Sequence, residues 1–268
     1  MKMQANERLV WLAALIALPL QPLAFYFVRV PLDHWLVSHV GAGSRAYAWL
    51  VTLYAPLTEE AAKLVPLLVP AILRDIRREN VARFALAIGL GFAIGEMWFI
   101  ADRIARVPQF AGVPIFQFGG YMNERLMTCM FHSAFVSLSL LGLRRNLALG
   151  FAGAVALHWL GNFPISLMNW NVGGFGKANW SIIIQLFLVF YLVGAMAWLW
   201  RLAFGFGSLK RMLYGRRQCP ACGSEYDPSF FAVNAGTKRY ERCPHCKRWQ
   251  WTTPAVNEST ASGPDVRQ

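Results

Sequence analysis

The chain has 268 residues, of which 56% are hydrophobic and 15% are charged, and its net charge is +12. A soluble domain carries about 45–50% apolar and about 25% charged residues, so this composition argues against a soluble globular protein. The mean hydropathy of +0.36 agrees. We therefore expect a protein of the lipid bilayer, whose excess of lysine and arginine holds cytoplasmic loops against anionic lipid. The charge indicates no clear nucleic-acid partner.

The chain begins with an apolar run that follows two basic residues. Lys2 and Arg8 precede LVWLAALIALPL, an arrangement that also occurs in signal peptides. No small-x-small cleavage site follows, and the apolar run continues through LAFYFV. We interpret residues 9–28 as a first transmembrane helix kinked by its two prolines, and residues 31–47 as a loop or interfacial segment.

Further apolar stretches reach the roughly 20 residues that a transmembrane helix needs. They lie near residues 47–73, 84–101, 126–143, 147–168 and 181–204. The predicted fold class is an all-α polytopic membrane protein with about six transmembrane helices. Basic residues crowd the segment before the first span and the segments after the second, fourth and sixth spans. By the positive-inside rule, both termini are expected to be cytoplasmic.

Few ionisable residues are expected to be buried within these spans. They are Glu59, Glu60 and Lys63 in the second span, Glu96 in the third, His132 in the fourth and His158 in the fifth. Charged groups inside a membrane are costly and usually mark a functional site. The predicted orientation brings these groups to a similar depth, and i, i+4 spacing puts Asn162 on the face of His158. The same spacing predicts an ion pair between Glu59 and Lys63.

Each of these residues also has a structural interpretation when it is taken alone. A single histidine can simply bond to a neighbouring carbonyl or hydroxyl group. Glu96 can pair with Arg103 or with Arg125, and the Glu59–Lys63 pair can be a packing device between helices. Their convergence at one depth favours a functional site.

Such a cluster can support hydrolysis of a peptide bond in two ways. A carboxylate shielded from solvent can take a proton from water, while imidazoles and an amide donate hydrogen bonds to the resulting oxyanion. Alternatively, Glu60, His132 and His158 can bind an active-site zinc that leaves one position open for water. The HExxH zinc motif is absent, and both mechanisms stay open. The alternative from another class is a non-enzymatic membrane protein that uses the cluster for ion binding or proton transfer.

Four ordered motifs between residues 55 and 165 carry a family resemblance. EEAAK, GLGFAIGE, RLMTCMFHSAF and LHWLGNF resemble the motifs of the PrsW family of intramembrane proteases. That family belongs with the CAAX prenyl proteases and the bacteriocin-processing (ABI) membrane proteins. The sequence departs from the family pattern at Met97, where the family usually has Asn, and no proline precedes His132.

The resemblance implies an intramembrane endopeptidase of the bacterial inner (cytoplasmic) membrane that cleaves membrane proteins, as the best-known member cleaves anti-sigma factors. It implies that the water-activating base is Glu59 or Glu60. The residues it marks as catalytic are Glu59, Glu60, Glu96, His132, His158 and Asn162, with Lys63 and Arg125 in supporting positions.

Two CxxC pairs follow the last span. Cys219 and Cys222 form the first and Cys243 and Cys246 the second, with 20 residues between them. This pattern is typical of a structural zinc ribbon, and the segments FFAV and KRYERC are β-prone around an Asn-Ala-Gly turn. Iron in a rubredoxin-like site and disulfides are the alternatives, although a reducing cytoplasm argues against disulfides. We therefore expect zinc.

The residues around the cysteines are strongly basic. We interpret Lys238, Arg239, Arg242, Lys247 and Arg248 as a solvated face of the ribbon rather than a nucleic-acid contact. The predicted organisation is a protease-like transmembrane domain (1–207), a basic juxtamembrane linker (208–217), a cytoplasmic zinc ribbon (218–252) and a disordered tail (253–268).

Overall fold

The computed structural model describes residues 6–118, 120–204, 215–228, 232–235 and 238–253. The chain divides into two compact units, Met1–Ala203 and Phe204–Gln268, and each is described by itself. The first unit is helical and the second contains the β-strands and the paired cysteines. Most of the predicted linker 208–217 and nearly all of the predicted tail 253–268 lie outside the described residues.

An interrupted helical segment, Glu7–Val40, opens the helical unit. It consists of α1 (Glu7–Ala17), α2 (Leu20–Ala24), the π-helical turn η1 (Phe25–Arg29) and α3 (Val30–Val40). Proline has no backbone N–H, so the hydrogen-bond ladder is interrupted near Pro19 and Pro22 and resumes in the wider π turn. The prediction of a loop at 31–47 was wrong for its first half, because α3 continues to Gly41, whose φ of 83° ends it.

The predicted second span, 47–73, is not one continuous helix. Helix α4 (Arg45–Ala62) ends after the two glutamates, and a 3₁₀ turn η2 (Val65–Leu68) and a short α5 (Pro70–Asp75) follow. Pro66 and Pro70 cannot donate the hydrogen bonds that would extend α4. The described residues therefore contain five segments, rather than six, that are long and apolar enough to cross a membrane: Glu7–Val40, Val81–Ala105, Tyr121–Gly142, Leu147–Asn169 and Gly176–Phe204.

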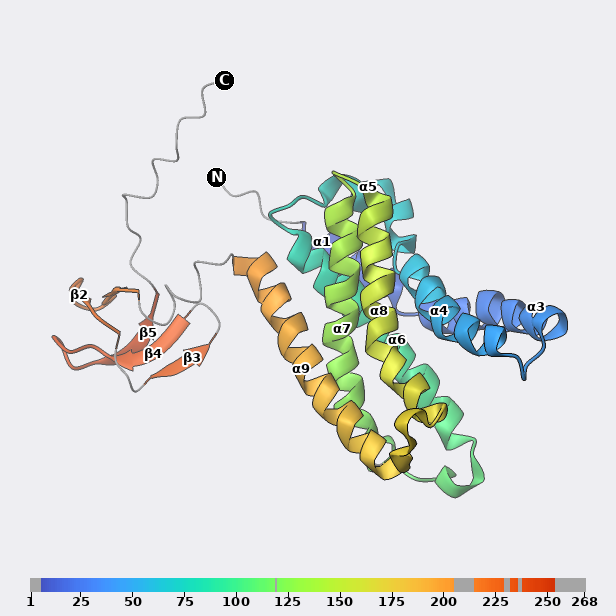
Figure 1. Ribbon diagram of the computed structural model, residues 1–268. Coiled ribbons are helices and arrows are strands. Elements are labelled where there is room, and N and C mark those ends of the chain that lie inside the picture. Colours follow the sequence, from blue (N-terminus) through green and yellow to red (C-terminus); the bar gives the residue numbers. More distant parts are fainter. Residues whose placement is uncertain (1–5, 119, 205–214, 229–231, 236–237, 254–268) are drawn as a thin grey trace. The chain divides into compact units, whose positions relative to one another are not determined.

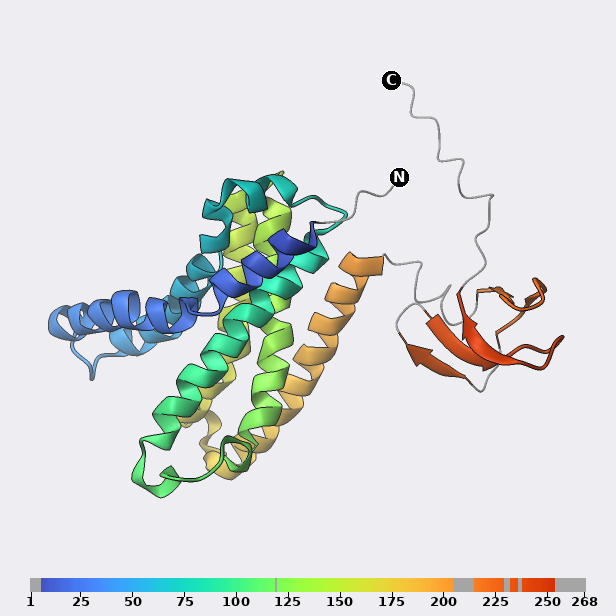
Figure 2. The ribbon, with the colours of Figure 1, turned by 180° about the vertical axis from the view of Figure 1, so that it is seen from behind.

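Four long helices form the rest of the unit. Helices α6 (Val81–Ala105), α7 (Tyr121–Gly142) and α8 (Leu147–Asn169) pack in sequence, and α9 (Gly176–Phe204) packs against α7 and α8, as Figures 1 and 2 show. Short 3₁₀ turns, η3 (Pro108–Phe110), η4 (Ile115–Gln117) and η5 (Val172–Gly174), occupy the connections. The predicted spans at 84–101, 126–143, 147–168 and 181–204 correspond to these four helices.

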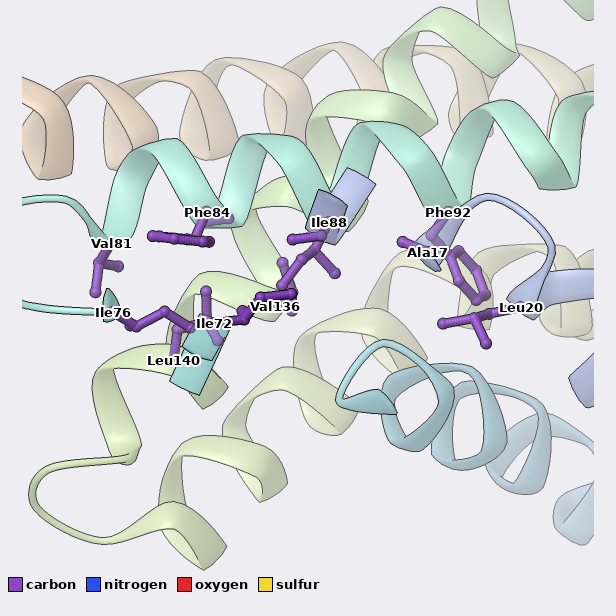
Figure 3. Packing of buried hydrophobic residues seen from close by; sticks show 12 residues of the cluster. Ala17, Leu20, Ile72, Ile76, Val81, Phe84, Ile88, Phe92, Val136 and Leu140 are labelled. Carbon is purple, nitrogen blue, oxygen red and sulfur yellow. The ribbon is translucent and has the colours of Figure 1, made fainter. Parts of the chain in front are cut away.

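Apolar side chains join α6 to its neighbours. Phe84, Ile88 and Phe92 of α6 meet Val136 of α7 in one buried cluster, which Figure 3 shows. Helices can pack closely where small residues such as glycine lie between them, and Gly95 beside Glu96 is one such residue. A Cβ atom at Gly95 would lie only 1.7 Å from the backbone oxygen of Leu18, which precedes α2. This approach places the neighbouring Glu96 against the N-terminal segment.

The cysteine-rich unit consists of two small antiparallel sheets. Strand β1 (Arg217–Gln218) pairs with β2 (Glu225–Tyr226), and β3 (Val233–Ala235), β4 (Lys238–Arg242) and β5 (Trp249–Thr252) form a second sheet in that order. In the second sheet Tyr240 lies opposite Val233 on one side and Trp251 on the other. The β-prone character of KRYERC is confirmed, whereas the two phenylalanines of FFAV lie outside the described residues.

A buried polar cluster supports this second sheet. The carboxylate of Glu241 is fully buried, accepts a hydrogen bond of 2.6 Å from the Thr252 hydroxyl and lies 3.4 Å from Nε of Arg239. Arg217 is buried beside it at 3.9 Å. The prediction that Arg239 lies on a solvated face was therefore wrong, because its guanidinium offsets the buried charge of Glu241. Lys238, Arg242, Lys247 and Arg248 are exposed, as expected.

Candidate active site

Glu60 lies in the last turn of α4 and is almost completely buried. Its Oε1 atom accepts a hydrogen bond of 2.5 Å from Nζ of Lys63 and one of 2.7 Å from Nδ1 of His158. The ammonium group of Lys63 also lies over the ring of Phe92, 4.9 Å from its centroid. Lys63 thus pairs with Glu60 at i, i+3 spacing, and not with Glu59 as its i, i+4 spacing predicted. The buried charge of Glu60 is offset within its own turn of chain.

Glu59, the neighbouring carboxylate, has a different set of partners. Its Oε1 atom accepts a hydrogen bond of 2.8 Å from the guanidinium of Arg29, and its Oε2 atom lies 3.5 Å from Nε2 of His158. His158 therefore lies between both glutamates, with one ring nitrogen toward each.

Arg29 was missed from the sequence, where it lies just beyond the predicted first span, 9–28. Its place at the end of η1 brings it to a carboxylate 30 residues further along the chain. π-Helical turns often occur at functional sites. The signal that could have found Arg29 is charge balance, because a buried cluster of three carboxylates needs more cations than Lys63 and Arg125.

Glu96 of α6 is the third carboxylate. Its Oε2 atom lies 2.9 Å from Nε2 of His132 and 3.3 Å from Nη1 of Arg125, both on α7. Of its two expected cationic partners, Arg125 is therefore the one that the structure provides. Arg103 instead lies over the rings of Phe25 and Phe99. Each of the three carboxylates thus has one cationic partner, which makes burial of the whole group tolerable.

The two histidines bring the carboxylates of different helices together. The ring centroids of His132 and His158 are 5.3 Å apart. A carboxylate oxygen of Glu59, a ring nitrogen of His132 and a ring nitrogen of His158 all lie within 4.8 Å of one another. These three residues could therefore hold a metal ion. Glu60, which was predicted in this set, is not part of that group, and its Oε1 atom accepts hydrogen bonds from Lys63 and His158.

A small space adjoins these groups, and we call it the central cavity. Its volume is about 100 Å³, and Glu59, Glu96, His132, His158 and Asn162 are among the residues that line it. Asn162, one helical turn beyond His158, has an exposed side chain with no hydrogen-bond partner among the described residues. Three carboxylates (those of Glu59, Glu96 and Glu124), two imidazoles and an available amide thus line one cavity, together with the guanidinium of Arg125. Glu60 and Lys63 are not among its lining residues.

The four paired cysteines form a second cluster. The Sγ atoms of Cys219 and Cys246 are 3.7 Å apart, and those of Cys222 and Cys243 are 3.8 Å apart. A tetrahedral site with metal–sulfur bonds of about 2.3 Å requires sulfur–sulfur separations of about 3.8 Å. The four cysteines therefore form a candidate metal site of suitable size and donor type. His245, inside the second CxxC pair, is exposed and is not part of it.

Neighbouring groups favour the thiolate form of Cys219. Burial opposes ionisation of this thiol. However, hydrogen bonds donated by the side-chain amide of Gln250 (2.7 Å) and the backbone N–H of Cys222 (3.3 Å) lower its pKa to about 6. The thiolate is the form that binds metal, so these contacts prepare the residue as a ligand.

No protein-family model, no curated protein and no solved structure matches this chain. The resemblance to the PrsW family therefore stays a prediction that rests on the four motifs. The geometry of the central cavity and of the cysteine cluster is the basis for a functional proposal.

Proposed function

We propose that this protein is an intramembrane endopeptidase of the PrsW type. The observation that carries the proposal is the gathering of Glu59, His132 and His158 from α4, α7 and α8 beside a cavity that Asn162 also lines. Ionisable groups buried in apolar helices mark functional sites, and few structural roles require three such groups to meet. The five membrane-length helices are compatible with an integral membrane protein, and we propose the bacterial inner membrane with both termini cytoplasmic.

In this proposal Glu59 is the residue that takes a proton from water. It lines the central cavity, whereas Glu60 is occupied by Lys63 and His158. The water oxygen bonds to the carbonyl carbon of the peptide, and its proton moves to Glu59. The proton then passes from Glu59 to the amide nitrogen as the carbon–nitrogen bond breaks. This step releases an amine and a carboxylic acid, and the acid loses its remaining proton on ionisation.

The remaining groups either donate hydrogen bonds to the reaction intermediate or hold the donating side chains in place. The amide of Asn162 donates a hydrogen bond to the oxyanion that forms at the carbonyl oxygen. His158, when both of its ring nitrogens carry protons, donates to Glu60 and toward the cavity. Glu60 and Lys63 fix the orientation of that ring, as carboxylates commonly do for catalytic histidines. Glu96 and Arg125 have the same relation to His132.

The same geometry fits a metal-dependent variant of this reaction. Each histidine has one ring nitrogen against a carboxylate, which is the arrangement that usually supports metal-bound histidines. A zinc ion held by Glu59, His132 and His158 would polarise the peptide carbonyl and lower the pKa of bound water. In the cysteine-rich unit we propose a structural zinc on Cys219, Cys222, Cys243 and Cys246, since four thiolates at these distances suit zinc.

A non-enzymatic membrane protein, in which the cluster binds an ion or transfers protons, is the competing proposal. In that role Glu59 would also exchange a proton, but no peptide bond would be hydrolysed, so cleavage of a reporter peptide separates the two proposals.

The test uses the full-length protein in liposomes with a membrane-spanning reporter peptide. We expect cleavage by the wild type, loss of cleavage in Glu59→Gln and His158→Ala, and normal cleavage in the exposed control Glu79→Gln. Unchanged cleavage in both site variants would contradict the proposal. The zinc content of the purified protein then separates the two mechanisms. One equivalent per chain, the zinc on the four cysteines, favours the metal-free mechanism. Two equivalents in the wild type and one in His158→Ala favour a zinc ion in the active site.

A further inference from the structure

A larger cavity adjoins the central one, and we call it the arginine cavity. Its volume is about 710 Å³, and its lining comes from α2, η1, α4, α6 and α8. Glu59, Glu96 and Asn162 line both cavities, so a molecule that fills the arginine cavity reaches the proposed catalytic groups. Two arginines, Arg29 and Arg103, also line it.

Both arginines are held against the same aromatic ring. The Cζ atom of Arg103 lies 4.7 Å, and that of Arg29 5.4 Å, from the centroid of the Phe25 ring. Arg103 also lies 5.7 Å from the centroid of Phe99, whose ring packs 5.0 Å from that of Phe25. A guanidinium on an aromatic face gains cation–π energy and is restricted in orientation. The two charges are thus held in the cavity wall.

The two arginines differ in how far their charges are neutralised. Arg29 donates to Glu59, whereas Arg103 has no carboxylate partner within the described part of the chain. The nearest acidic residue in sequence, Asp102, is paired with Arg106 at 2.7 Å. The arginine cavity therefore offers one cation, already positioned, that forms no ion pair with any carboxylate of the described residues.

We propose that Arg103 binds a carboxylate side chain of the peptide substrate and so makes the enzyme selective for an acidic residue near the cleaved bond. This inference rests on the proposed function. A guanidinium binds a carboxylate through two parallel hydrogen bonds, which gives geometric specificity as well as affinity. A peptide is the occupant that the cavity favours, because Glu59 and Glu96, beside which the reacting carbonyl must lie in the proposed reaction, are among the residues that line it.

The test compares reporter peptides that carry Glu, Gln or Lys at each position within four residues of the cleaved bond, in liposomes of zwitterionic lipid. At one position the wild type should cleave the Glu reporter at least about tenfold faster than the Lys reporter, as expected for a charge-assisted hydrogen bond. Arg103→Gln should abolish this preference and Arg103→Glu should invert it. Arg106→Glu, at the same end of α6 but outside the cavity lining, should retain it.

Other results would overturn the inference. If Arg103→Glu keeps the wild-type ratio of Glu to Lys cleavage at every position, Arg103 does not read the substrate. If the variant alters all reporters equally, and only when anionic lipid is added, Arg103 contacts a lipid headgroup instead. In both of these outcomes the proposed function still stands if the wild type cleaves the neutral Gln reporter and Glu59→Gln does not. If the wild type cleaves no reporter, both proposals fall together.

Discussion

Replacing Lys63 by methionine removes the ammonium group that forms an ion pair with Glu60. Lys63 has no exposed surface, and its Nζ atom lies 2.5 Å from Oε1 of Glu60. Methionine keeps most of the side-chain volume, so the change isolates the charge. Glu60 then retains the hydrogen bond from His158, but its charge is left without a permanent partner.

The expected destabilisation follows from this geometry. Removing one partner of a buried ion pair costs about 3–5 kcal/mol, because the remaining charge is uncompensated. We expect the lower part of this range, about 3 kcal/mol, since His158 still donates to Glu60. The second change Glu60→Gln removes that charge, so the double variant Lys63→Met/Glu60→Gln should recover about 2 kcal/mol or more of the loss.

The assay is equilibrium unfolding in mixed detergent micelles, followed by circular dichroism. Lys177→Met, in the exposed first turn of α9, is the matched control and should change the free energy of unfolding by less than about 0.5 kcal/mol. A loss in Lys63→Met no larger than in the control, or a double variant less stable than the single one, would refute the assignment of Lys63 as the partner of Glu60.

Three further predictions concern other parts of the molecule. Gly95→Ala should destabilise the helical unit, because its Cβ atom would lie 1.7 Å from the backbone oxygen of Leu18. Gly194→Ala is the control and should not destabilise it, because a Cβ atom there would have nothing within 4 Å. Equal unfolding midpoints of the two variants would contradict this packing. Asn162→Ala should lower kcat about 10²–10³-fold with a smaller effect on KM, as for loss of an oxyanion donor, and a change confined to KM would argue for substrate binding alone. Cys222→Ser should remove one zinc equivalent by elemental analysis and leave reporter cleavage intact; unchanged zinc would exclude the cysteine site.

The convergence of ionisable side chains was predictable from the sequence. Glu59, Glu96, His132 and His158 lie in apolar stretches, and the energetic penalty for a charge in such surroundings leaves few arrangements other than mutual contact. The candidate metal site of the four cysteines was predictable for a different reason, because CxxC spacing places two thiols close enough to bind the same metal ion.

The ion pairs of the site were less predictable. Lys63 can reach a residue three or four positions earlier on a helix, and helical spacing alone does not distinguish Glu60, its partner in the structure, from Glu59. Arg29 could not be assigned to Glu59, because the contact depends on how an irregular, proline-interrupted segment turns in space. The break after α4 was also missed, since hydropathy averaged over 47–73 does not register the loss of N–H donors at prolines.

In the proposed reaction water adds to a peptide carbonyl in the central cavity, and isotope labelling detects this addition. The full-length protein in liposomes is incubated with the reporter peptide in H₂¹⁸O, and the fragments are weighed by mass spectrometry. We expect two fragments with one ¹⁸O atom in the new terminal carboxylate of the N-terminal fragment, and no fragments with Glu59→Gln. An intact reporter, together with dissipation of a proton or ion gradient that Glu59→Gln abolishes, would contradict it.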